Sequence, residues 1–224
     1  MTTRHSSTAA FLLAIGLLAA GGPRPAEAAD AKGAFALDGI GALTCGDLTT
    51  GILKGDASLR AAVGSWMLGY LSAMNRIDAG TYDATPVQMP DALVNMVVGV
   101  CAKDATARVE MVVYALLHAF DPAKSVAESA EMQVAANGQA TTLRKDTLVA
   151  VQRYLIAQKL LTGDADGTFN STTEAALKSF QQKQNLPQTG LPDPATIVRV
   201  LVEIPAQASA PAPAPAQAKA PPKK

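Results

Sequence analysis

Few side chains in this sequence are of the types that carry out covalent catalysis. The chain has two histidines, His5 and His118, whereas a zinc peptidase usually takes several histidine ligands. Cys45 and Cys101 are its two cysteines, and a cysteine nucleophile needs a free thiolate. No Gly-x-Ser-x-Gly elbow and no phosphate-binding loop occur. A glycosidase with paired carboxylates stays open on sequence alone, but we expect a protein that is not an enzyme and uses no cofactor.

The acidic stretch Asp164-Ala-Asp166-Gly167 is similar to the start of a calcium-binding loop. Such a loop needs glycine at its sixth position and glutamate at its twelfth. A loop that began at Asp164 would have Phe169 and Ala175 there. Both requirements fail, so we expect no metal site.

Composition favours small helical domains. The 224 residues suffice for one ordinary domain or two small ones, and 49% are apolar although only 4% are aromatic. A β-rich fold would need more aromatic and β-branched residues in alternation. The formal charge is zero, and no run of basic residues is longer than a pair, as at Lys223-Lys224. We therefore expect no nucleic-acid partner, which would leave a basic face.

Residues 1–28 have the pattern of a secretory signal peptide. Arg4 and His5 precede the apolar run Ala9–Ala20, and Ala26-Glu27-Ala28 offers a small-x-small cleavage site. The run is shorter than the roughly 20 residues that span a bilayer. We expect export to the periplasm and no transmembrane segment after cleavage.

Export determines the expected state of the cysteines. In an oxidising compartment an even number of cysteines predicts a disulfide, and Cys45 can pair only with Cys101 within the chain. The bridge would stabilise the fold by roughly 4 kcal/mol through loop closure. Two free thiols are the alternative.

Residues 37–122 are expected to form a first helical domain. Thr44 and Asp47 can cap a helix through Leu53, apolar residues recur at helical spacing over 58–77, and Pro90 suits the start of a further helix. The Thr44-Cys45 pair and the stretches 64–76 and 94–117 resemble the HdeA/HdeB-like periplasmic helical proteins. That family includes acid-stress chaperones with one disulfide, and similar small domains occur among toxin-immunity proteins.

Residues 123–143 are predicted to be a partly helical linker, because their composition is rich in Ala, Ser, Gln and Thr and Asn137-Gly138 would break a helix. Residues 204–224 alternate Ala and Pro, which predicts a disordered, extended tail.

Residues 144–203 contain three short helical patterns. Two Thr-Gly turns, Thr162-Gly163 and Thr189-Gly190, separate them, Ser171–Glu174 reads as a capping box, and Asp193-Pro194 as a cap with a first-position proline. We expect Gly163 to end the first helix.

This pattern resembles the peptidoglycan-binding domain family, a three-helix cell-wall module with two repeats. The matching residues are Val151-Gln152, Leu155, Asp166-Gly167-x-Phe169, Thr173, Ala176, Phe180-Gln181, Leu186, Thr189-Gly190, Asp193 and Thr196. The family often has Gly-Pro after the Phe, where this chain has Asn170-Ser171, and we expect Asn170 to adopt the left-handed conformation there. The resemblance implies that murein binds in a shallow groove between helices.

Six side chains offer polar groups for such a ligand. Amides and hydroxyls suit the neutral sugars, amide bonds and terminal carboxylate of murein. The candidates are Gln152, Tyr154, Asp166, Thr173, Gln181 and Thr189.

These observations predict an all-α fold with two small helical domains, the first stapled by one disulfide and the second a three-helix bundle. The predicted function is that of a secreted, non-catalytic, wall-associated protein that binds murein through its C-terminal module and contacts a periplasmic protein through its first domain. The alternatives are a wall-associated acid-stress chaperone and a toxin-immunity or inhibitor protein.

Overall fold

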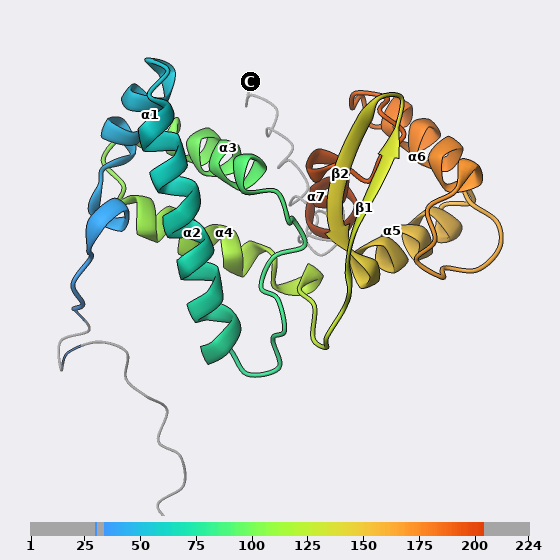
Figure 1. Ribbon diagram of the computed structural model, residues 1–224, viewed down its shortest axis with the longest axis horizontal. Helices are drawn as coiled ribbons and strands as arrows, with labels where there is room; N and C mark the ends of the chain where they lie inside the picture. The colour runs from blue at the N-terminus through green and yellow to red at the C-terminus, as the bar shows by residue number, and fades with distance from the viewer. Residues whose placement is uncertain (1–29, 31–33, 204–224) are drawn as a thin grey trace, which may run out of the picture. The chain divides into compact units, whose positions relative to one another are not determined.

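The N-terminal lobe, residues 37–123, consists of packed helices (Figure 1), and its buried apolar residues belong to the hydrophobic cluster that continues into the C-terminal lobe. The computed structural model describes residue 30 and residues 34–203, so the predicted signal peptide and tail lie outside the described residues. Its elements are η1 (Gly39–Ala42), α1 (Cys45–Leu53), α2 (Ala57–Ile77), α3 (Pro90–Cys101), α4 (Val109–Ala119) and η2 (Asp121–Ala123).

Two of these helices start at a cap or first residue that the sequence predicted, and α2 has a cap that was not predicted. Thr44 accepts a hydrogen bond from the Asp47 N–H at 3.1 Å, and Asp56 accepts one from the Leu59 N–H at 2.9 Å. Pro90 begins α3 as predicted. Side-chain oxygens thereby satisfy N–H groups that a helix start leaves without partners.

The predicted disulfide is present. Cys45, the first residue of α1, is bonded to Cys101, the last residue of α3, and both are fully buried. The bridge joins positions 56 residues apart in the sequence. It therefore fixes the two helices that flank α2 in a lobe whose core is small.

A β-hairpin follows the lobe, where the sequence predicted a partly helical linker. β1 (Glu131–Ala136) pairs antiparallel with β2 (Gln139–Arg144), so the all-α prediction is wrong at this point. Asn137 and Gly138 both have positive φ, 53° and 74°, as in the two-residue turn that closes a tight hairpin. This dipeptide connects two strands instead of ending a helix.

The C-terminal lobe, residues 145–203, contains α5 (Lys145–Ala157), α6 (Ser171–Lys183), α7 (Pro194–Val198) and η3 (Arg199–Glu203). Its three α-helices agree with the predicted three-helix bundle, and β2 packs on it by burying Leu143 completely. The described residues from Leu37 onward belong to one compact unit. The core of the lobe includes Leu148, Val151, Leu155, Leu177, Phe180 and Ile197.

Three local details differ from the sequence prediction. α5 ends at Ala157, and Lys159 with φ 58° makes the left-handed turn that was assigned to Gly163. Asn170 has φ −141° and caps α6 by accepting from the Thr173 N–H at 2.9 Å, so it is not left-handed. Because Asn170 supplies this oxygen, Ser171 is the first residue of the helix and not its cap.

None of the helices in residues 34–203 combines the length and the apolar character that a bilayer-spanning segment requires.

Candidate functional site

The loop between α5 and α6 is held by one buried amide. Gln152 on α5 is 2% exposed, and its Oε1 accepts from the Gly167 N–H at 2.8 Å. Its Nε2 donates to the Thr168 carbonyl at 3.0 Å and approaches the Thr173 hydroxyl at 3.4 Å. The side chain therefore replaces backbone partners that this loop lacks.

The loop between α6 and α7 is held in the same way. Gln181 on α6 is fully buried, and its Oε1 accepts from the Gly190 N–H at 2.8 Å. Its Nε2 lies 2.9 Å from both the Leu191 carbonyl and the Thr196 hydroxyl. We call Gln152 with its loop the first repeat and Gln181 with its loop the second repeat.

The two repeats correspond residue for residue around their glycines. Gly167 and Gly190 have φ of 73° and 72°, a conformation that glycine adopts without steric cost. Asp166 and Thr189 precede them, and each side chain accepts a hydrogen bond from the N–H two residues further on. The partner of the Thr189-Gly190 turn is thus Asp166-Gly167, and not Thr162-Gly163 as the sequence indicated.

The six predicted ligand residues do not gather into one site. Gln152, Thr173 and Gln181 are buried, and their polar atoms are used by the bonds within the lobe. Asp166 is exposed and Thr189 half-buried, each beside the glycine of its own repeat. As ligand contacts all six stay predictions, although the buried three have clear structural tasks.

Tyr154, the sixth candidate, packs its ring edge-on against Phe180 at 5.6 Å between centroids. Burial raises the pKa of its phenol, and nearby Arg199 acts in the opposite direction. The phenol is therefore neutral at physiological pH, where it acts as a hydrogen-bonding group.

The charges at the two repeats are set by local hydrogen bonds. The Thr168 N–H lowers the pKa of the Asp166 carboxyl. The Lys178 ammonium, 2.7 Å from Glu174, lowers the pKa of that carboxyl. Both carboxylates are therefore ionised at neutral pH.

Three open hollows border the C-terminal lobe. One of about 510 Å³ lies between β1 and the first repeat, and we call it the β1 groove. A second of about 420 Å³ lies between β2 and the second repeat, and a third of about 570 Å³ lies between α3 and α7. The β1 groove is lined by Ala130, Met132, Gln133, Val134, Ala135, Lys145, Gly167, Thr168 and Phe169.

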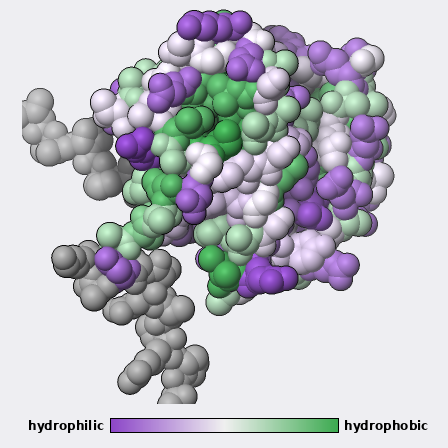
Figure 2. All heavy atoms as spheres, turned by 60° about the vertical axis from the view of Figure 1, so that its left-hand side comes forward, coloured by the Kyte–Doolittle hydropathy of each residue, from purple (hydrophilic) through white to green (hydrophobic). Residues whose placement is uncertain are grey.

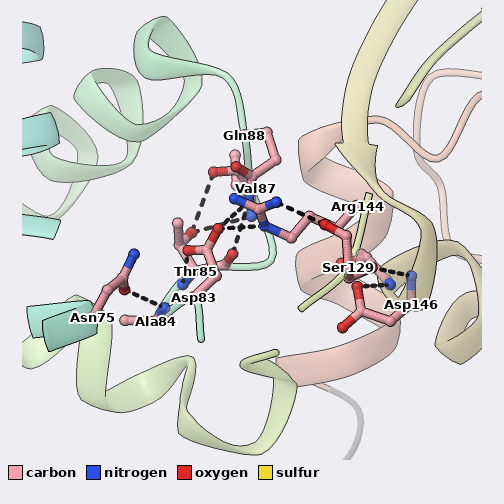
Figure 3. A network of polar contacts seen from close by, with 10 residues as sticks. Asn75, Asp83, Ala84, Thr85, Val87, Gln88, Ser129, Arg144 and Asp146 are labelled. Atoms are coloured by element: carbon pink, nitrogen blue, oxygen red, sulfur yellow. Dashed lines mark hydrogen bonds and ion pairs between the residues drawn. The ribbon is translucent and has the colours of Figure 1, made fainter. Parts of the chain in front are cut away.

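A polar network fixes the hairpin to the N-terminal lobe (Figure 3). The Arg144 Nε donates to the Asp83 carboxylate at 2.6 Å, and its Nη1 donates to the Ser129 carbonyl at 2.9 Å. The guanidinium also lies 5.0 Å from the centroid of the Tyr82 ring. Burial alone would lower the pKa of Arg144, but Asp83 outweighs it and the pKa is raised.

The hairpin tip contacts the second repeat. The Asn137 amide donates to the Thr189 carbonyl at 3.1 Å and to Glu174 Oε1 at 3.3 Å. Asn137 was not among the predicted site residues, because residues 123–143 were assigned to a linker. Its Asn-Gly dipeptide was the local signal that could have indicated the hairpin. Lys145 lies within the predicted domain, residues 144–203, but was not chosen as a ligand candidate.

The hollows around the C-terminal lobe are lined by groups that can bind a ligand. Within residues 34–203 no three His, Cys, Asp or Glu side chains lie close enough to hold a metal ion. The hollows present amides, backbone groups, apolar side chains and one or two charged side chains each.

Comparison with known proteins identifies the C-terminal lobe. Residues 144–199 match the family described as "Putative peptidoglycan binding domain", so the chain carries a domain of this family and the predicted resemblance is confirmed. The match does not extend to residues 37–122, whose resemblance to HdeA/HdeB-like proteins stays a prediction. A comparison with curated proteins returns no match.

A solved structure also matches part of the chain. It is SltB3 from Pseudomonas aeruginosa in complex with NAG-anhNAM-pentapeptide, with 21% identity, a TM-score of 0.25 and coverage of 46% of this chain. The matched part is 26% of that protein. At this TM-score the likeness adds nothing to the assignment.

Proposed function

We propose that this protein is exported to the periplasm, binds murein without cleaving it, and contacts another protein through its N-terminal lobe. The observation that carries the proposal is the pair of Gln-held repeats within residues 144–199, the part of the chain that matches the peptidoglycan-binding family. Murein offers neutral sugars, amide bonds and carboxylates, which match the binding groups around these repeats.

The non-catalytic part of the proposal rests on the residue types available. The cysteines are bonded to each other, so neither offers a thiolate. His118 is exposed, and its Nδ1 lies 3.1 Å from the Asp121 carboxylate on the surface. Neither arrangement provides an activated nucleophile.

Exposed apolar side chains support a protein contact by the N-terminal lobe. Met111 and Tyr114 lie one turn apart on α4 and are 50% and 44% exposed, and Ile77 at the end of α2 is 69% exposed. Figure 2 shows one face of the molecule, on which hydrophobic side chains gather and hydrophilic ones border them. Neighbouring exposed apolar side chains, such as Met111 and Tyr114 on α4, offer a surface to a protein partner.

Sedimentation with purified sacculi tests the proposal. The chain without its signal peptide should pellet with sacculi, and soluble murein fragments should release it. No enrichment over a helical control protein would refute murein binding. The supernatant should contain no newly released muropeptides, and their release would refute the non-catalytic assignment.

A further inference from the structure

Backbone groups on the outer edge of β1 have no hydrogen-bond partner among the residues that the structure describes. Backbone groups alternate along an antiparallel strand between the partner strand and the opposite side. The Lys145 N–H donates to the Ala130 carbonyl at 2.9 Å, so the even-numbered residues of β1 direct their backbone N–H and C=O groups toward β2. Gln133 and Ala135 therefore direct their N–H and C=O groups outward, and in the described part of the chain no third strand pairs with them.

Those outward groups border the β1 groove. Gly167, Thr168 and Phe169 of the first repeat form the opposite wall, and the volume of about 510 Å³ lies in the range of ligand sites. A chain segment that lay in this groove would be extended, because it would add to the sheet as a third strand.

One cation lies in the same groove. Lys145 is exposed, and its aliphatic stem packs on Gly167, since a Cβ on that glycine would lie 2.7 Å from the Lys145 Cγ. Its ammonium makes none of the ion pairs found within residues 34–203. Asp166 beside Gly167 adds an exposed carboxylate on the adjacent loop.

Comparison of the two repeats shows which backbone carbonyl of the first repeat is available to a ligand. Lys145 and Glu174 precede Gln152 and Gln181 by the same number of residues, and so occupy equivalent positions. In the second repeat the Asn137 amide bridges Glu174 and the Thr189 carbonyl. In the first repeat no described residue donates to the equivalent Asp166 carbonyl. The Thr189 carbonyl thus accepts a hydrogen bond from the chain's own Asn137 amide, whereas the equivalent Asp166 carbonyl stays accessible.

We propose that the β1 groove binds the stem peptide of murein as an added strand, with a peptide carboxylate on Lys145. The backbone N–H and C=O groups of Gln133 and Ala135 form hydrogen bonds with the backbone of the peptide. A peptide N–H near the free end of the stem donates to the Asp166 carbonyl. Stem peptides that carry diaminopimelate or lysine combine carboxylates with an ammonium group, which suits Lys145 beside Asp166. This inference rests on the proposed function and specifies peptide recognition over glycan recognition.

The test uses the chain without its signal peptide and two soluble probes. One probe is a synthetic stem tetrapeptide, and the other is a murein glycan strand from which an amidase has removed the peptides. Binding is measured by calorimetry and by amide chemical shifts. The peptide should bind and shift the amides of Gln133, Ala135 and Lys145, whereas the glycan should leave these amides unchanged.

Substitutions identify the groove as the site. Gln133→Pro removes one outward N–H, which an edge strand tolerates, and should weaken peptide binding about fivefold. Lys145→Glu reverses the charge and should weaken it about three- to tenfold. Gln133→Ala keeps the N–H and should bind like the parent chain.

Matched controls separate loss of the site from loss of the fold. Thr142→Pro alters the residue opposite Gln133 in the register but on the other edge of the hairpin. Lys183→Glu makes the same charge change on an exposed residue at the end of α6. Both controls should bind the peptide like the parent chain, and urea midpoints verify folding.

The outcomes distinguish this inference from the proposed function. Sedimentation with sacculi combined with unchanged peptide affinity in Gln133→Pro and Lys145→Glu would overturn the groove while murein binding stands. Binding of the glycan alone would also overturn it. Absence of sedimentation together with absence of peptide binding would overturn both. Peptide binding that only the groove substitutions weaken would support the inference.

Discussion

Removing the Asp83 carboxylate should destabilise the whole chain, because this group connects the two lobes. Its side chain is 5% exposed, and it lies 2.6 Å from Arg144, whose side chain is 17% exposed. Asp83→Ala leaves the Arg144 guanidinium without its anion and the Thr85 N–H without its acceptor. Breaking one side of a buried ion pair typically costs 3–5 kcal/mol. We expect about 3 kcal/mol, since Arg144 keeps the Ser129 carbonyl and the Tyr82 ring.

The assay is urea unfolding followed by two probes. Fluorescence of Trp66, the single tryptophan, reports the N-terminal lobe, and far-UV circular dichroism reports all helices. The midpoint should fall by about 1 M or more, because the urea dependence for small proteins is roughly 1–3 kcal/mol per molar. In the parent chain the two probes should give one transition.

Two further variants sharpen the result. Asp91→Ala removes an 83% exposed carboxylate that lies 3.5 Å from Arg60, and it should cost less than about 1 kcal/mol. Adding Arg144→Ala to Asp83→Ala should cost little more, because the unpaired charge disappears with it. Equal midpoints for Asp83→Ala and Asp91→Ala would refute the reasoning.

Three other predictions concern the disulfide, the repeat glycines and acid. Replacing Cys45 and Cys101 together by Ser should lower the free energy of unfolding by about 4 kcal/mol, measured by urea titration against the parent chain under oxidising conditions. Gly190→Ala should destabilise the fold by about 1–2 kcal/mol, because the φ of Gly190 is 72° and a Cβ there would lie 2.8 Å from Glu174. The control Gly69→Ala, on a helix with open space around the residue, should be neutral or stabilising. A reversed order of the two variants in thermal melting would contradict the assignment. The pKa values of the Asp166 and Glu174 carboxyls are lowered in the folded protein. Their contribution to the free energy of unfolding is therefore complete above the unfolded pKa and is lost as pH falls through the folded pKa. The double variant Asp166→Asn with Glu174→Gln should flatten the acidic part of a stability-versus-pH curve, and an unchanged acidic part would contradict this.

Periodic features were predictable from the sequence, and the contacts between lobes were not. The helices 57–77 and 90–101 follow from apolar spacing and from Pro90, and the disulfide follows from two cysteines in an exported chain. The Asp83–Arg144 pair joins residues 61 apart in the sequence, and no local pattern specifies such a partner. The hairpin had a local signal in Asn137-Gly138, but its strands are rich in Ala, Gln and Thr and lack a strong β pattern.

The ligand candidates show a different limit. A glutamine in a family pattern has the same side chain whether it faces a ligand or holds a loop. Only its burial distinguishes the two tasks, and Gln152 and Gln181 are 2% and 0% exposed. The sequence therefore located the domain that carries both glutamines, but it did not show which turns are equivalent or which surface binds peptide or glycan.

The contacts between the lobes also determine how the protein responds to force. If the wall holds the C-terminal lobe and a partner holds the N-terminal lobe, tension enters the chain between η2 and β1. The Tyr82 N–H and the Asp83 carbonyl bind the backbone of Ser125 at 2.8 and 3.0 Å, and Arg144 binds Asp83 in parallel. Tension would load these bonds together with the contacts between η2 and η3, while the disulfide keeps α1 joined to α3.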